Sequence, residues 1–208
     1  MLGGMAAKRL LDLACTTLLL LLLTPVLVVV LSAMAVDMVV VARDRGGFLY
    51  REPRVSRGRV FSLRKFRTLR RAVLDEMRAA GSHARLYEAD PANLTWAGRH
   101  LLKPWYLDEL PQLLNVLRGD ISLVGPRPWP PEMVKRQVEE GLTYRNQVRA
   151  GLTGPAQVTK GSGLRFADLD LRYVERLRML PGLSLVRYDL RILWATVRVI
   201  VRGEGLSY

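Results

Sequence analysis

The chain contains 208 residues, 50% of them hydrophobic and 25% charged, with a formal net charge of +13. This composition excludes wholesale disorder, and the length is sufficient for a sizeable core. The single cysteine excludes an internal disulfide, and the two histidines are widely separated, so no Cys/His cluster suggests a zinc site. The basic excess indicates an anionic partner, which composition alone leaves open among nucleic acid, anionic lipid and a phosphorylated substrate.

The first predicted element is an uncharged apolar segment over residues 13–36. At about 1.5 Å per residue it is long enough to span a bilayer. It is too long for the core of a cleaved signal peptide, and more apolar sequence follows it. Basic residues flank it on both sides, and because such residues favour the cytoplasm, a straight span would place one flank on the disfavoured side.

Near the centre of this segment, Thr24 and Pro25 predict a break, because proline removes a helical hydrogen bond and clashes with the preceding turn. A helix bent there enters one leaflet and returns to the same face, and the Thr24 hydroxyl can bond a carbonyl of the preceding turn. A straight spanning helix with a tolerated proline is the alternative. Lys8 and Asp12, four residues apart in "KRLLD", share a helix face and form a candidate interfacial anchor pair.

The middle of the chain predicts short strands alternating with helices. The predicted elements are loop and short strands over residues 43–60, a strand with a basic face within 59–71, a helical pattern within 70–90, and helices over 131–141 and 167–180. Residues 144–163 are loop-rich.

The last predicted helix covers residues 184–202. Four of its arginines fall within about 60° of one another on a helical wheel, and apolar residues with Trp194 fill much of the rest. This pattern favours an amphipathic helix in the lipid interface. A core helix with one solvated face is the alternative.

An adjacent acid pair, Asp108 and Glu109, is the strongest chemical signal in this basic chain. The pattern predicts a helix over residues 109–117, with Asp108 as its N-cap, Pro111 in its first turn and Gly119 near its end. A helix N-terminus favours ionised carboxylates. One carboxylate can attack phosphorus, the other can hold Mg²⁺, and the neighbouring basic residues can bind a diphosphate. An ordinary N-cap followed by a first-turn glutamate is the alternative.

Three stretches of the sequence resemble the motifs of the bacterial sugar transferases, the monotopic phosphoglycosyl transferases. In chain order they are "SLRKFRTL" at residues 62–69, "YLDELPQLLNVLRGDISLVGPRP" at 106–128 and "AGLTGPAQV" at 150–158. The "KRLLD" opening and the Thr-Pro break are also similar to that family, in which Ser-Pro is common at the break. The matches keep the family's order and cover nearly the entire chain, and the central one is long and highly specific.

The resemblance implies an α+β, mainly helical fold. Its parts are an N-terminal re-entrant membrane helix over residues 1–42, and a compact cytoplasmic catalytic domain over residues 43–208 with short strands and amphipathic interfacial helices. It implies monotopic attachment to the cytoplasmic face of the bacterial inner membrane, with membrane lipids as partners and no nucleic acid.

The implied reaction transfers a phospho-sugar from a UDP-sugar donor to undecaprenyl phosphate. The products are UMP and a polyprenyl diphosphate sugar, in the first membrane step of a surface glycan pathway. The resemblance makes Asp108 the nucleophile, forming a covalent aspartyl-phosphosugar intermediate, and makes Glu109 a ligand of the cofactor Mg²⁺. The basic residues that it assigns to substrate phosphates are Lys103, Arg127, Lys65, Arg67 and Arg145.

Several positions depart from the family pattern. Pro104, Trp105 and Tyr106 replace small hydroxyl residues before the acid pair, and Ala150 and Pro155 replace proline and tryptophan. The chain also resembles the small form of the family, without an additional N-terminal membrane bundle. The alternatives are a catalytically inactive relative, a basic membrane-anchored module that binds nucleic acid or anionic lipid, and a phosphotransferase that uses Asp108 as a general base.

Overall fold

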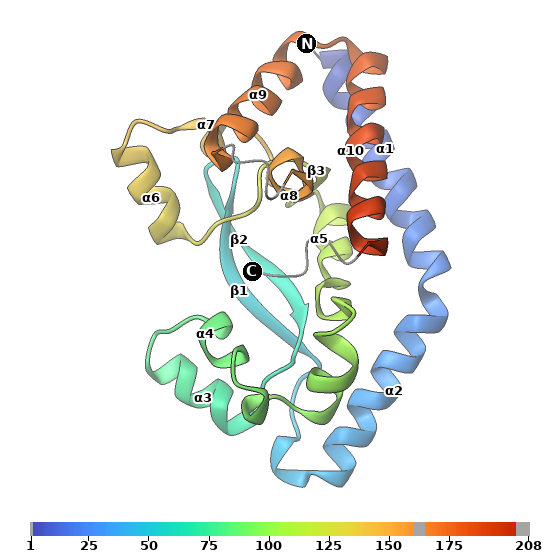
Figure 1. The fold of residues 1–208 in the computed structure, drawn as a ribbon, viewed down its shortest axis with the longest axis vertical. Coiled ribbons are helices and arrows are strands. Elements are labelled where there is room, and N and C mark those ends of the chain that lie inside the picture. The colour runs from blue at the N-terminus through green and yellow to red at the C-terminus, as the bar shows by residue number, and fades with distance from the viewer. Residues whose placement is uncertain (1, 160–164, 203–208) are drawn as a thin grey trace. The chain divides into compact units, whose positions relative to one another are not determined.

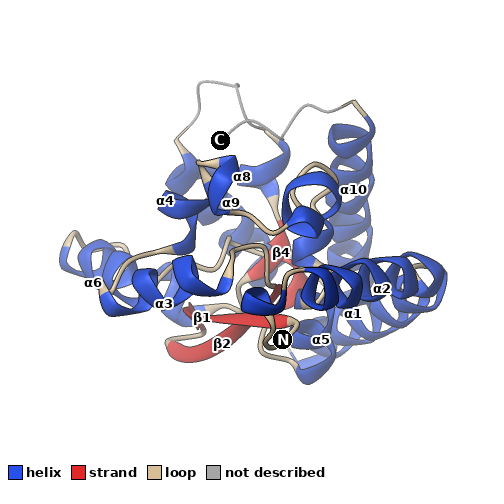
Figure 2. Cartoon of the chain, turned by 90° about the horizontal axis from the view of Figure 1, so that it is seen from below, coloured by secondary structure: helices blue, strands red, loops and turns tan. Residues whose placement is uncertain are grey.

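The computed structural model describes residues 2–159 and 165–202 (Figure 1). The chain is mainly helical with a few short strands, as Figure 2 shows, and is compatible with the predicted α+β class. It divides into two compact units. The first unit comprises Met1–Leu18, Pro53–Leu63 and Leu114–Tyr208, and the second unit comprises Leu19–Glu52 and Arg64–Leu113.

The N-terminal apolar segment forms two helices, α1 (Leu2–Leu22) and α2 (Thr24–Val40), with a bend of 60° between them. Pro25 lies in the first turn of α2, where it has no N–H to donate. The Thr24 hydroxyl donates instead to the carbonyl of Leu20 at 2.9 Å, as the sequence predicted. Within residues 2–159 and 165–202, no single helix is long and apolar enough to cross a membrane, whereas this bent pair passes that test by length and composition.

Two small sheets and a series of short helices make up the rest of the chain. The strands are β1 (Leu49–Ser56) with β2 (Arg59–Phe66), and β3 (Ser122–Val124) with β4 (Gly151–Thr153). The helices between and after them are α3 (Arg71–Ala79), α4 (Ala84–Glu88), α5 (Gln112–Arg118), α6 (Pro131–Glu139), α7 (Tyr144–Gln147), α8 (Pro155–Val158), α9 (Phe166–Met179) and α10 (Gly182–Val201). The single-turn helices are η1 (Ala42–Asp44), η2 (Pro91–Asn93), η3 (Gly98–Leu102) and η4 (Leu107–Glu109).

In the first unit, β3 and β4 pair in parallel, with Ser122 opposite Gly151. A Cβ on Gly151 would lie 2.0 Å from the backbone nitrogen of Gly125. Only glycine therefore allows the chain after β3 to pass this close to β4. This approach fixes the start of the "GPRP" turn.

Polar contacts hold α1 in the first unit. Lys8, which is 6% exposed, donates to Asp189 of α10 at 2.5 Å and to the Val124 carbonyl at 2.9 Å. Asp12, which is 1% exposed, accepts hydrogen bonds from the Ser122 hydroxyl and from the backbone N–H of Leu123. The candidate anchor pair is thus buried, and each member binds β3 or α10.

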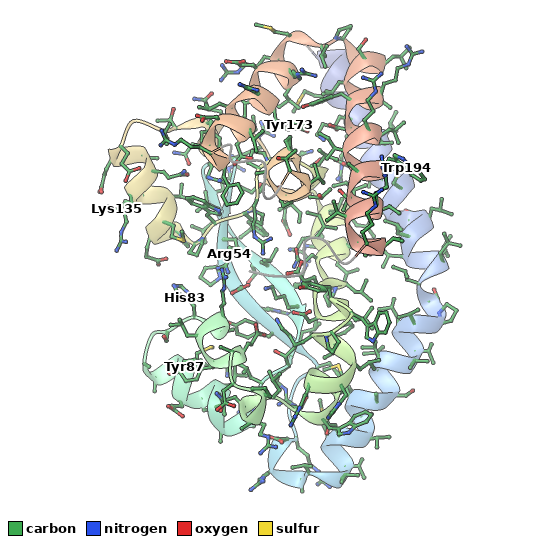
Figure 3. All side chains as sticks on the ribbon, in the orientation of Figure 1. Arg54, His83, Tyr87, Lys135, Tyr173 and Trp194 are labelled. Carbon is green, nitrogen blue, oxygen red and sulfur yellow. The ribbon has the colours of Figure 1, made fainter. Side chains whose placement is uncertain are left out.

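The C-terminal helix α10 has two distinct apolar faces. Leu185 and Ile192 are buried beside the charged Asp189. Trp194 is 65% exposed, in contrast to the buried Tyr173 of α9 (Figure 3), and Val197 is 49% exposed. The helix predicted for residues 184–202 is confirmed, and it has one buried and one exposed apolar face.

The second unit contains two apolar clusters. One joins Val30 and Met34 of α2 to Phe66, Ala97 and Leu102. The other surrounds α3 and α4, which confirm the helical pattern expected within residues 70–90. Burial of these side chains stabilises the second unit, which contains the acid pair.

Two expectations about local structure were wrong. Asp108 is not the N-cap of a helix over residues 109–117, because it lies inside the separate turn η4 and α5 begins at Gln112. Pro111 has no N–H to donate to the carbonyl of Leu107, so the two helical segments do not merge. Residues 144–163 were expected to be loop-rich, but their described part, residues 144–159, contains α7, β4 and α8. Residues 160–163 lie outside the described residues.

We expect replacement of Asp189 by alanine to destabilise the protein by about 3 kcal/mol, because it leaves the Lys8 ammonium buried without its anion. Arg187→Ala removes an exposed charge from the same helix and should cost less than about 0.5 kcal/mol. Denaturant unfolding of the purified proteins measures both. Equal stability of the two variants would contradict the role given to the Lys8–Asp189 pair.

Candidate active site

Tyr106, two residues before Asp108, has unusual backbone geometry. Its φ is 54°, in the left-handed region that few non-glycine residues adopt. The chain then turns through η4, which places Asp108 and Glu109 in different surroundings. The Asp108 side chain is 3% exposed, whereas that of Glu109 is 29% exposed. The two carboxylates are therefore suited to different roles.

Lys65 of β2 lies between two glutamates. Its ammonium nitrogen is 3.2 Å from Glu52 Oε1 and 3.7 Å from Glu109 Oε1. Burial alone would lower the pKa of Lys65, but the negative charges of Glu109 and Glu52 outweigh it and raise that pKa. Lys65 is therefore a permanent cation beside the acid pair.

Lys103 provides a second cation. It follows η3, a π-helical turn, and its ammonium nitrogen is 3.5 Å from Asp108 Oδ2. It also donates to Glu88 Oε2 at 2.9 Å, and Glu88 Oε1 accepts a hydrogen bond from the Thr68 hydroxyl at 2.6 Å. Burial opposes the charge of Lys103, but Asp108 and Glu88 raise its pKa overall.

The carboxyl group of Asp108 is strongly perturbed. Burial raises its pKa from 3.8 to about 6, and Glu109 adds to this shift, while the charges of Lys103 and Lys65 oppose it. Its Oδ1 atom is buried and has no hydrogen-bond partner in the described part of the chain. At pH 7 the group is still about 90% ionised, given a pKa about one unit lower. It is a poorly solvated anion with one oxygen that no described group binds.

The acidic residues fit a magnesium site that is completed by substrate. No group of three His, Cys, Asp or Glu side chains within residues 2–159 and 165–202 is arranged to hold a metal ion. Mg²⁺ needs only one or two carboxylates when phosphates and water supply the other ligands. The partly exposed Glu109 meets that requirement.

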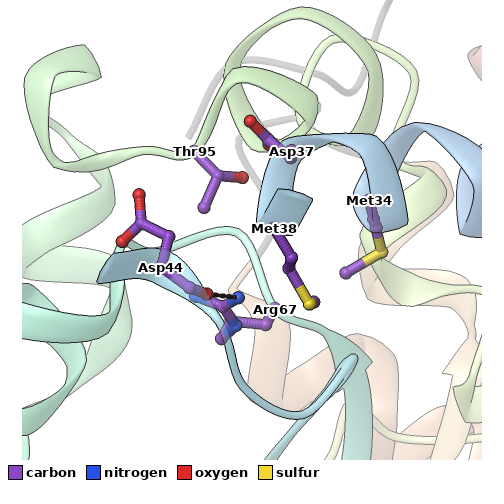
Figure 4. A pocket seen from close by; sticks show the side chains of 6 residues that line it. All are labelled: Met34, Asp37, Met38, Asp44, Arg67 and Thr95. Carbon is purple, nitrogen blue, oxygen red and sulfur yellow. Dashed lines mark hydrogen bonds between the residues drawn. The ribbon is translucent and has the colours of Figure 1, made fainter. Parts of the chain in front are cut away.

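Arg67 is committed to the protein framework. Its guanidinium donates to the backbone carbonyls of Gly47, Leu69 and Asp44, at 3.1, 3.0 and 2.6 Å. Figure 4 shows it beside Asp44, at a cavity of about 10 Å³ that holds at most about one water molecule. Burial lowers the pKa of Arg67. The expected binding of substrate phosphates by Arg67 stays a prediction.

Arg127 and Arg145 belong to the first unit, on the "GPRP" turn and α7. Arg145 is 5% exposed and donates to Gln137, to Asp170 and to the backbone carbonyl of Arg127. Its guanidinium also lies 4.1 Å from the ring centre of Trp129. Arg145 therefore supports the turn that carries Arg127.

Sequence reasoning identified Lys65, Lys103 and the acid pair, which the structure brings together. It missed Glu88 and Thr68. Glu88 lies 15 residues from Lys103 and 20 from Thr68 along the chain, on a different element from each. No local pattern signals such a contact, since helical and strand periodicity relate only near neighbours.

A buried carboxylate held beside ammonium groups suits chemistry at phosphorus, where charge stabilisation and positioning dominate. The profile of the bacterial sugar transferases matches residues 4–203. The chain therefore belongs to the bacterial sugar transferase family, as the sequence motifs indicated.

Individual relatives agree with this assignment. The chain is 34% identical over 208 residues to an undecaprenyl-phosphate galactose phosphotransferase of Salmonella typhimurium, and 35% identical over 202 residues to an undecaprenyl-phosphate glucose phosphotransferase of Komagataeibacter xylinus. These alignments cover 95% and 93% of this chain, but only 41% and 36% of the two relatives. A UDP-glucose:undecaprenyl-phosphate glucose-1-phosphate transferase of Caulobacter vibrioides is 34% identical over 94% of this chain and 67% of its own length.

Proposed function

We propose that this chain transfers a sugar 1-phosphate from a UDP-sugar to undecaprenyl phosphate, as the first membrane step of a surface glycan pathway. The observation that carries the proposal is Asp108, a buried carboxylate with one unpartnered oxygen and two lysines close by. The names and the extent of the matched relatives support the choice of donor and acceptor.

The reaction proceeds in two displacements at the phosphorus that carries the sugar. Asp108 Oδ1 attacks this atom and forms an acyl phosphate, the bond to the bridging oxygen breaks, and UMP leaves with that electron pair. A phosphate oxygen of undecaprenyl phosphate then attacks the same phosphorus. The bond to Asp108 breaks, the carboxylate is restored, and the polyprenyl diphosphate sugar leaves.

The lysines and the second acid have supporting roles. Lys103 and Lys65 neutralise charge on the phosphates as the nucleophile approaches, and Arg127 contacts the phosphates. Glu109 and the phosphates would hold Mg²⁺, which supplies electrostatic stabilisation of the transferred group.

The bent helix pair is the proposed membrane attachment. We assign α1 and α2 to a re-entrant hairpin that enters from the cytoplasmic face of the bacterial inner membrane and returns to it. Exposed apolar side chains along both helices support this assignment, including Leu21 at 67% and Val39 at 70%. The exposed face of α10 that carries Trp194 would rest in the interface.

Asp108→Asn should reduce UMP release from a UDP-sugar panel by at least about a thousandfold, because the amide is not a nucleophile. The assay uses nanodisc-held protein with Mg²⁺ and undecaprenyl phosphate, and Asp168→Asn, an exposed residue of α9, is the matched control. Without acceptor, the wild type should release one UMP per chain and retain a phospho-sugar on the peptide containing Asp108, detected by mass spectrometry. Near-normal turnover of Asp108→Asn would remove the nucleophile assignment.

Chelation of Mg²⁺ should stop turnover and leave the fold unchanged, since the ion is held largely by substrate phosphates. Glu109→Gln should raise the Mg²⁺ concentration for half-maximal turnover by about tenfold or more, because changes at a metal site typically reduce metal affinity by this factor. A titration of activity against Mg²⁺ measures this, with Glu132→Gln, an acid in the first turn of α6, as control. Activity that persists in excess chelator would refute the metal role.

Pro25→Ala restores a backbone donor and should reduce the 60° bend, favouring a straight helix across the bilayer. Cysteines introduced at Gly4 and Gly46 report whether both flanks are labelled from the same side of sealed vesicles. We expect same-side labelling in the otherwise unchanged protein and a population with opposite-side labelling in Pro25→Ala. Opposite-side labelling without the proline change would disprove re-entry.

A further inference from the structure

Lys103 is shared between two carboxylates, and the nucleophile is the more distant one. Its ammonium nitrogen is 2.9 Å from Glu88 Oε2 and 3.5 Å from Asp108 Oδ2. The first distance is that of a strong charge-assisted hydrogen bond, and the second is at the outer limit of one. Glu88 therefore holds the ammonium group more closely than Asp108 does, although both carboxylates pair with it.

Glu88 is itself held by a rigid part of the second unit. Its other oxygen accepts the Thr68 hydroxyl at 2.6 Å, and Thr68 is 3% exposed. The backbone carbonyl of Thr68 accepts from the nitrogen of Thr95 at 2.8 Å. A Cβ on Gly98 would lie 2.4 Å from that same carbonyl, so the start of η3 is packed against it. Thr68, Glu88 and Lys103 thus form a supported chain that ends beside the nucleophile.

We infer that Glu88 is a positioning residue for the proposed transfer, which holds the Lys103 ammonium group beside the reacting phosphate throughout the reaction cycle. This inference rests on the proposed function. Asp108 loses its negative charge when it becomes an acyl phosphate and regains it when the product leaves. Glu88 keeps its charge through both steps, so Lys103 always retains an anionic partner.

Loss of the Glu88 charge should loosen the Lys103 ammonium group, because its shortest hydrogen bond would then go to a neutral amide. A displaced ammonium group binds the donor phosphates less tightly. If Glu88 acts through Lys103, its loss should have no further effect once Lys103 itself is replaced.

The test compares Glu88→Gln, Glu88→Asp and Thr68→Val with the wild type, and uses Glu132→Gln as the matched control. Lys103→Met and the double variant Glu88→Gln with Lys103→Met complete the series. The first readout is the rate of single-turnover UMP release in nanodiscs without acceptor. The second is the dissociation constant of a UDP-sugar, measured by calorimetry in the Asp108→Asn background, and it requires no turnover.

We expect Glu88→Gln to lower the maximal rate at least about tenfold and to weaken donor binding, whereas the same change in the Lys103→Met background should alter neither. Glu88→Asp should recover part of the rate, Thr68→Val should show a smaller change in the same direction, and the control should match the wild type. Thermal unfolding of each variant reports whether it is folded.

A wild-type rate and wild-type donor binding in Glu88→Gln would overturn the inference. So would an equal loss with and without Lys103, since that pattern indicates a structural role only. If the wild type binds UDP-sugars but releases no UMP from any of them, while the two changes remain coupled in binding, the positioning role of Glu88 stands and the proposed transfer reaction falls.

Discussion

The candidate site depends on one constraint, the burial of the Asp108 carboxylate. Taking a carboxylate out of water disfavours its charged form, which is why its pKa rises to about 6. The lysines at positions 65 and 103 limit this rise and keep the group mostly ionised at neutral pH. Weak solvation of an anion that is still charged is a favourable condition for attack on phosphorus.

The basic excess of the chain serves more than one purpose. Arg67 and Arg145 are buried and bind backbone carbonyls and acids within the protein. Arg9 donates to the carbonyls of Val116 and Leu117, at the open end of α5. Guanidinium groups suit this work because each offers several donors in a fixed plane. Part of the positive charge therefore stabilises the fold.

Buried polar groups also hold the largely apolar helix α1 in place. Lys8 and Asp12 are both buried, and each is satisfied by an opposite charge, a hydroxyl or the backbone of β3. Breaking one of these contacts leaves an unpaired buried group, which costs more than the contact itself contributes. Such contacts define the register of α1 in a way that apolar packing alone would not.

The sequence by itself determined the elements with strong periodicity, the break at Thr24 and Pro25, and the family with its acid pair. These features are local or lie in contiguous motifs, so spacing and residue type are enough to predict them. The tertiary structure alone decided that Arg67 binds the Asp44 carbonyl, that Lys8 pairs with Asp189, and that Glu88 and Thr68 hold Lys103. These contacts join residues 15 to 181 positions apart. Hydrogen bonds and desolvation depend on distance in space, which chain folding sets and local sequence does not.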